Sequence, residues 1–156
     1  METMDHAIMN GYTFAWGSDV SEKGFSFRDG LAIVPQDESM ILVEGADNAN
    51  FSDAGAQKIS SAFDVPMQEK VITQEMRQLA FDNYETTDDH GMHVTGIARD
   101  QNGAKYFRVK NSWGIEKNEC DGYFFASEAY MKYKTINIFL HKDALPKQLK
   151  KKLGIS

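Results

Sequence analysis

Residues 90–114 read HGMHVTGIARDQNGAKYFRVKNSWG. Two strand-like runs, at residues 92–98 and 105–110, are separated by a turn-like segment that contains Asn-Gly. Asn-Gly between two such runs is the strongest short-range signal of a β-hairpin. The stretch therefore predicts two adjacent antiparallel strands, with His93 near the start of the first and Asn111 at the end of the second.

The rest of the chain predicts an α+β domain. Further strands are expected at residues 12–17, 31–34, 122–125 and 135–140, and helices at residues 3–10, 73–85, 127–132 and 143–153. We expect Thr3 and Thr73 to cap the first two helices. Residues 36–72 have weak periodicity and predict an irregular loop or insertion. Antiparallel strands with helices at their edges indicate a half-open barrel, and residues 1–156 are expected to form a single domain.

Composition excludes several classes of function. The 156 residues are 42% hydrophobic and carry a net charge of −6, so binding to nucleic acid or to an anionic membrane is disfavoured. One cysteine, Cys120, permits neither an intrachain disulfide nor a cysteine-based zinc site, and no metal or other cofactor is expected. No apolar run approaches the ~20 residues of a membrane helix, and the N-terminal residues lack a signal peptide's basic region.

The predicted hairpin suggests nucleophilic catalysis. A thiolate is activated by an imidazole that is fixed in one tautomer by a hydrogen-bond acceptor. We expect His93 to be the general base and acid, with Nε2 toward the thiol and Nδ1 toward the amide oxygen of Asn111. Trp113 is expected to shield that hydrogen bond from water.

Two other side chains could compete for these roles. His90 follows the polar run 86–89 and is expected in a solvent-facing loop, with metal binding beside Asp88 or Asp89 as a minor alternative. Cys120 lies in an acidic loop, where neighbouring carboxylates raise the pKa of a thiol, so it is not expected to be a nucleophile.

The segment 109–114 (VKNSWG), followed by 121–124 (DGYF), resembles the asparagine region of papain-superfamily cysteine peptidases, and His93 matches their catalytic histidine. Within that superfamily the chain resembles the bleomycin hydrolase and aminopeptidase C family more closely. Supporting segments are FAWGSDV at 14–20, YMKYKT at 130–135 and HKDALP at 141–146. The resemblance implies the β-rich, right-hand half of a papain-like fold, an antiparallel half-barrel with peripheral helices, incomplete relative to the whole peptidase.

The same resemblance implies that the nucleophilic cysteine comes from a preceding helical half, which this sequence lacks. We expect the chain to be the C-terminal half of a cysteine-type aminopeptidase that cleaves at peptide N-termini, inactive alone. The alternative is a stand-alone, non-catalytic binding module that associates with itself or with a partner. The family also implies peptide substrates, a hexameric ring and a cytoplasmic location. The tail after the lysine-rich helix, residues 154–156, is short, so N-terminal cleavage rests on the resemblance alone.

Overall fold

The computed structural model describes residues 1–44, 57–59 and 61–155. Its α-helices are α1 (Glu2–Met9), α2 (Gln74–Asp82), α3 (Glu128–Lys134) and α4 (Lys147–Leu153), and its short 3-10 turns are η1 (Glu38–Met40), η3 (Ser61–Phe63) and η4 (Lys142–Ala144). The strands are β1 (Phe14–Ser18), β2 (Phe25–Ser26), β3 (Leu31–Ala32), β4 (Leu42–Glu44), β5 (Gln57–Ile59), β6 (His90–Arg99), β7 (Lys105–Lys110), β8 (Tyr123–Ser127) and β9 (Thr135–Phe139).

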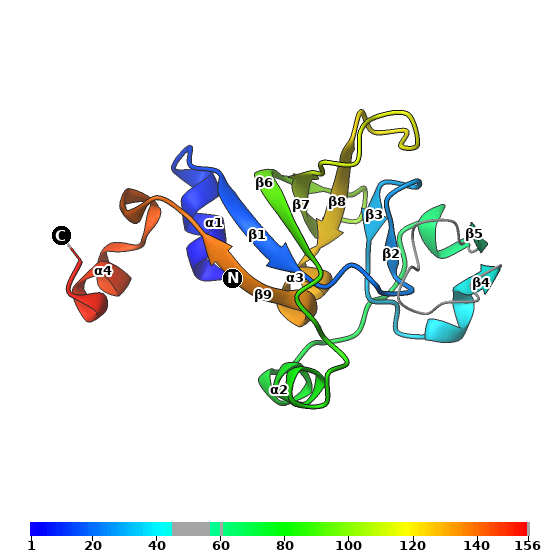
Figure 1. Cartoon of the computed structure of the whole chain (residues 1–156), viewed down its shortest axis with the longest axis horizontal. Helices are drawn as coiled ribbons and strands as arrows, with labels where there is room; N and C mark the ends of the chain where they lie inside the picture. The colour runs from blue at the N-terminus through cyan, green and yellow to red at the C-terminus, as the bar shows by residue number, and fades with distance from the viewer. Residues whose placement is uncertain (45–56, 60, 156) are drawn as a thin grey trace.

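Seven strands form one curled sheet in the order β2-β3-β8-β7-β6-β1-β9. All neighbours run antiparallel except β3 and β8. Figure 1 shows the small β4–β5 pair at one end of the molecule and α4 with the C-terminus at the other. The α+β half-barrel expected from the sequence is confirmed.

The hairpin of β6 and β7 lies at the centre of the sheet. Its register pairs His93 with Lys110 and Val94 with Val109, and then shifts at a bulge before Gly96. Asp100 Oδ1 accepts hydrogen bonds from two backbone N–H groups of the turn, and Gly103 takes a φ of 85°, a conformation that glycine adopts without strain. The Asn-Gly signal thus predicted this hairpin correctly.

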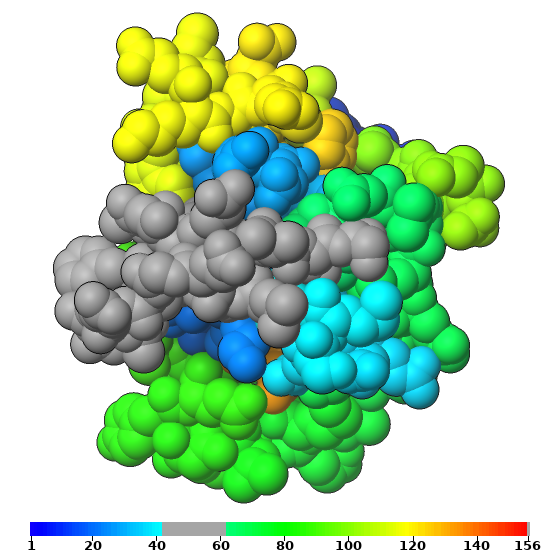
Figure 2. Space-filling view, turned by 90° about the vertical axis from the view of Figure 1, so that its right-hand side faces the viewer, coloured from blue at the N-terminus to red at the C-terminus, as the bar shows by residue number. Residues whose placement is uncertain are grey.

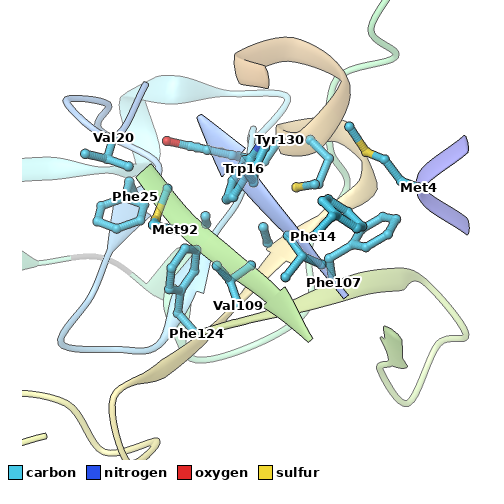
Figure 3. Packing of buried hydrophobic residues seen from close by; sticks show 14 of the residues in the cluster. Met4, Phe14, Trp16, Val20, Phe25, Met92, Phe107, Val109, Phe124 and Tyr130 are labelled. Carbon is cyan, nitrogen blue, oxygen red and sulfur yellow. The ribbon is translucent and has the colours of Figure 1, made fainter. Parts of the chain in front are cut away.

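One main hydrophobic core packs the buried side chains of several strands against those of α3 (Figure 3). Trp16, Phe107 and Phe124 are fully buried, together with Tyr130 of α3. The Trp16 indole N–H donates to Thr135 Oγ1 at 2.8 Å, so its only polar atom is satisfied inside the core. This bond joins β1 to the start of β9, and the Thr135 hydroxyl in turn donates to the Met131 carbonyl of α3.

Three local expectations need correction. Helix α1 begins at Glu2 and receives no side-chain cap, so Thr3 does not cap it, whereas Thr73 does accept a hydrogen bond from the Met76 N–H at the start of α2. Residues 36–72 include the β4–β5 pair and two 3-10 turns, and 45–56 with 60 lie outside the described residues. Strand β6 begins at His90, two residues earlier than predicted.

None of the helices formed by the described residues is long and apolar enough to cross a bilayer.

The core predicts a contrast between two phenylalanines in strands. Phe107→Ala empties a fully buried site and should lower the free energy of unfolding by about 3–5 kcal/mol. Phe139→Ala removes a ring that is 81% exposed and should change it by less than about 0.5 kcal/mol. Urea unfolding of both variants measures the difference, and equal effects would contradict this packing.

Candidate active site

Alternation along β6 and β7 decides which side chains share a face. Successive residues of a strand point to opposite sides of the sheet. Met92 and Val94 are buried, so His90 lies on the core face with them, whereas His93 is exposed on the opposite face. On β7, Phe107 and Val109 are buried, and the same alternation continues to the buried Asn111. His90 and Asn111 therefore extend the face that carries the buried residues Met92, Val94, Phe107 and Val109.

The imidazole of His90 meets the amide of Asn111. His90 Nε2 lies 2.7 Å from Asn111 Oδ1, which also accepts the Ser112 backbone N–H at 2.7 Å. An amide oxygen cannot donate, so Nε2 carries the hydrogen of this bond. Nδ1 is then the ring nitrogen that can exchange a proton with a reacting group. This reverses the assignment of the two nitrogens expected from the sequence.

Trp113 packs against the same imidazole. The two ring centroids are 4.9 Å apart, with the planes inclined by 30°. Phe25 and Phe27 contact the indole edge-on at 5.9 and 5.3 Å, and the Trp113 side chain remains 42% exposed. In Figure 2 the segment after Asn111, in yellow, lies directly beside the blue residues around β2. The indole thus lies between the His90 ring and two phenylalanines.

The Asn111 amide is only half satisfied. The side chain is 4% exposed, and Nδ2 has no hydrogen-bond partner among the residues that the structure describes. Leaving a buried donor unpaired costs about 1–3 kcal/mol. The amide is therefore held by the hydrogen bonds to its oxygen. This N–H₂ group lowers the stability of the fold, while the oxygen orients His90.

The expected contact between His93 and Asn111 is not formed. His93 pairs with Lys110 on one side and with Ala15 on the other, and its Nε2 lies 2.8 Å from Thr13 Oγ1. The prediction started the strand at residue 92 and paired His93 with Asn111 because each lies at the end of its strand. Which side of the sheet a side chain faces is set instead by the two-residue period of a strand. Counting by twos from the apolar residues Met92 and Val94 would have indicated His90.

Cys120 lies in surroundings that disfavour a thiolate. Burial raises the pKa of its thiol, and the charges of Glu119 and Asp121 raise it further. Its sulfur packs so closely on Gly30 that a Cβ there would come within 2.7 Å. Cys120 is a half-buried packing residue in this structure, as the acidic sequence around it indicated.

No group of three or more His, Cys, Asp and Glu side chains within residues 1–44, 57–59 and 61–155 is arranged to hold a metal ion. Asp89, which the sequence offered as a minor metal partner of His90, instead accepts hydrogen bonds from Thr87 Oγ1 at 2.6 Å and from the Ser21 N–H at 3.2 Å.

The hydrogen bond to Asn111 predicts a distinct NMR signal for His90. Its Nε2 proton should exchange slowly with solvent and appear in a ¹⁵N-resolved spectrum, because it is bonded under Trp113. The exposed ring of His93 should give no protected proton. Asn111→Ala should remove the His90 signal, and a protected signal on His93 that depends on Asn111 would contradict the geometry.

The raised pKa of Cys120 predicts slow alkylation. At pH 7 iodoacetamide should react with Cys120 more slowly than with free cysteine, whose pKa is about 8.5, because less thiolate is present. The rate should keep rising as pH increases above that value. Mass spectrometry of the modified chain measures it, and a rate that is already at its plateau below pH 7 would be the contrary result.

Known proteins share both the sequence pattern and the fold. The pattern of the Peptidase C1-like family matches residues 46–155, a span that includes His90, Asn111 and Trp113. Aminopeptidase C of Listeria innocua is 42% identical over 60 residues, which are 38% of this chain and 13% of that protein. Aminopeptidase C of Lactobacillus helveticus is 34% identical over 70 residues, 45% of this chain and 15% of that protein.

The fold agrees with the sequence match. The crystal structure of PepW from Lactobacillus rhamnosis HN001 superimposes with a TM-score of 0.59 at 19% identity, covering 98% of this chain and 28% of that one. The chain thus matches only a minor part of the length of these relatives. The resemblance to aminopeptidase C drawn from the sequence is confirmed at this partial coverage, and the chain belongs to the Peptidase C1-like family.

Proposed function

We propose that this chain is the His/Asn-bearing part of an aminopeptidase C-like cysteine peptidase, with His90 as general base and acid, Asn111 as its orienting residue and Trp113 as its shield. The observation that carries the proposal is the 2.7 Å contact between His90 Nε2 and Asn111 Oδ1 beside the indole of Trp113. His90 takes the catalytic place that the sequence resemblance gave to His93.

The arrangement supports amide hydrolysis through a thioester. His90 Nδ1 accepts the proton of a cysteine thiol, and the thiolate attacks the scissile carbonyl carbon. The resulting imidazolium then protonates the leaving amine as the C–N bond breaks. In the second half, His90 takes a proton from water, whose oxygen displaces the thiolate from the acyl group. A neutral amide suits the orienting role because the resting pair already carries one negative and one positive charge.

The nucleophile in this proposal belongs to a part of the enzyme outside this chain. Cys120 is the only cysteine here, and its raised pKa opposes thiolate formation. Alone, the chain is therefore proposed to be inactive. Cleavage at peptide N-termini, assembly into a hexamer and a cytoplasmic location enter the proposal through the family resemblance only, and residues 1–156 are taken as one domain of the larger enzyme.

A stand-alone binding module is the second candidate function. Large apolar side chains are exposed on and just after α2: Leu79 is 64% exposed, Phe81 55% and Tyr84 84%. Such neighbouring exposed apolar groups favour association with another protein surface. In that case the chain would form a complex without supporting any turnover.

Reconstitution distinguishes the two functions. The chain is mixed with a recombinant segment of Listeria innocua aminopeptidase C that excludes the 60 residues matched here, and release of a fluorophore from an aminoacyl amide is measured. We expect no turnover by either part alone and turnover by the mixture. His90→Ala should lower kcat by about 10⁴-fold or more, as loss of a triad histidine does, whereas His93→Ala should change it less than about threefold.

The relative's own matched segment, mixed in the same way, shows that the assay reports complementation. Loss of activity on His93→Ala but not on His90→Ala would overturn the assignment of the base. Turnover by the chain alone that disappears on Cys120→Ala would refute the need for an external nucleophile.

A further inference from the structure

The residues that lead into His90 are fastened to the end of β1. Strand β1 ends at Ser18, which pairs in register with His90. Before His90 the chain runs through Thr86 and Thr87, and the buried ammonium of Lys134 donates to Thr86 Oγ1 at 3.0 Å. This approach to β6 has the composition of a loop but is held by buried polar contacts.

Asp19 makes the central contacts of this fastening. Its side chain is 1% exposed, and Oδ1 accepts from both the N–H and the hydroxyl of Ser21 at 2.9 Å. Oδ2 accepts the backbone N–H of Thr87 at 3.0 Å. The backbone of Asp19 is fixed as well, because its carbonyl accepts the Tyr130 hydroxyl at 2.8 Å. One rigid carboxylate thus joins the end of β1 to the residue three before His90.

A second carboxylate completes the unit. Asp89, directly before His90, accepts the Thr87 hydroxyl at 2.6 Å and the Ser21 N–H at 3.2 Å. Asp19 and Asp89 therefore share both Ser21 and Thr87 as partners. Burial raises the pKa of Asp19, whereas hydrogen bonds from Thr87, Asp19 and Ser21 outweigh burial and lower the pKa of Asp89. The two groups consequently differ in proton affinity, and Asp19 is the one that retains a proton more readily.

We propose that Asp19 is a positioning residue for His90. Through its contacts with Thr87 and Asp89, Asp19 holds the start of β6 in the place where the imidazole contacts Asn111 and Trp113. Its catalytic consequence rests on the proposed function, whereas the placement of the ring does not. Asp19 never touches the imidazole or a substrate in this role. Its effect passes through the backbone of residues 87–89.

Asp19→Asn tests the proposal with little change of shape. The amide has one oxygen in place of two, so in either orientation its N–H₂ group faces a backbone N–H, that of Thr87 or that of Ser21. Ser21→Ala removes one hydroxyl bond and leaves the Thr87 contact intact. Asp143→Asn is the matched control, because Asp143 is an exposed carboxylate that contacts a different histidine, His141.

The readout is the protected Nε2 proton of His90 in the whole 156-residue chain, with the ring-current shift that Trp113 imposes on the His90 carbon-bound protons. Asp19→Asn should speed exchange of that proton about tenfold or more and reduce the ring-current shift, because the start of β6 opens more often. Ser21→Ala and Asp143→Asn should stay within about twofold of the parent chain. Phe107→Ala serves as a control for general stability, because it weakens the core without touching the contacts of Asp19. It should leave the His90 signals unchanged while the chain is folded.

An unchanged exchange rate in Asp19→Asn would overturn the proposal, and so would an equal change in Phe107→Ala, since the effect would then report general stability. If Asp19→Asn does not fold, Asp89→Asn serves in its place and should shift the signals in the same direction. The measurement needs no catalysis. A reconstituted peptidase indifferent to His90→Ala would therefore refute the proposed function and leave this inference standing.

Discussion

The antiparallel pairing of β6 with β1 and β7 is the constraint on which the site depends. Because Val94 lies opposite Val109 and both are buried, the residues reached by steps of two share their face. Those steps lead to His90 on one strand and to Asn111 at the end of the other. A slip of β6 by one residue would turn His90 away from Asn111 and expose Met92 and Val94, so packing and site geometry are secured by the same register.

The site is built at some expense to stability. Asn111 buries an N–H₂ group that has no partner within the described part of the chain, and Trp113 keeps a large ring 42% exposed. Neither residue adds to the stability of the core. An apolar residue at position 111, for example, would bury no unpaired donor. Both choices make sense if an imidazole must be held in one tautomer in a place that a substrate can reach. The orientation of His90 explains these two features together.

Much of this arrangement could be predicted from local sequence. Asn-Gly specified the central hairpin, and the α+β class with its half-barrel followed from the order of the elements. The histidine that contacts Asn111 was predicted wrongly because residues 86–89 have the composition of a loop, whereas β6 already begins at His90. The contacts that hold this start come from Asp19, which is 68 residues away from Thr87 in sequence. Such long-range bonds leave no local pattern, but the alternation around Met92 did carry the signal.

The hydrogen bond of Asn111 couples it to His90 and not to His93. A double-mutant cycle tests it directly by urea unfolding of the chain with alanine at each position singly and in both pairs. We expect a coupling free energy of about 0.5–1.5 kcal/mol between His90 and Asn111, the usual net value of one hydrogen bond, and none beyond error between His93 and Asn111. A larger coupling for His93 than for His90 would contradict it.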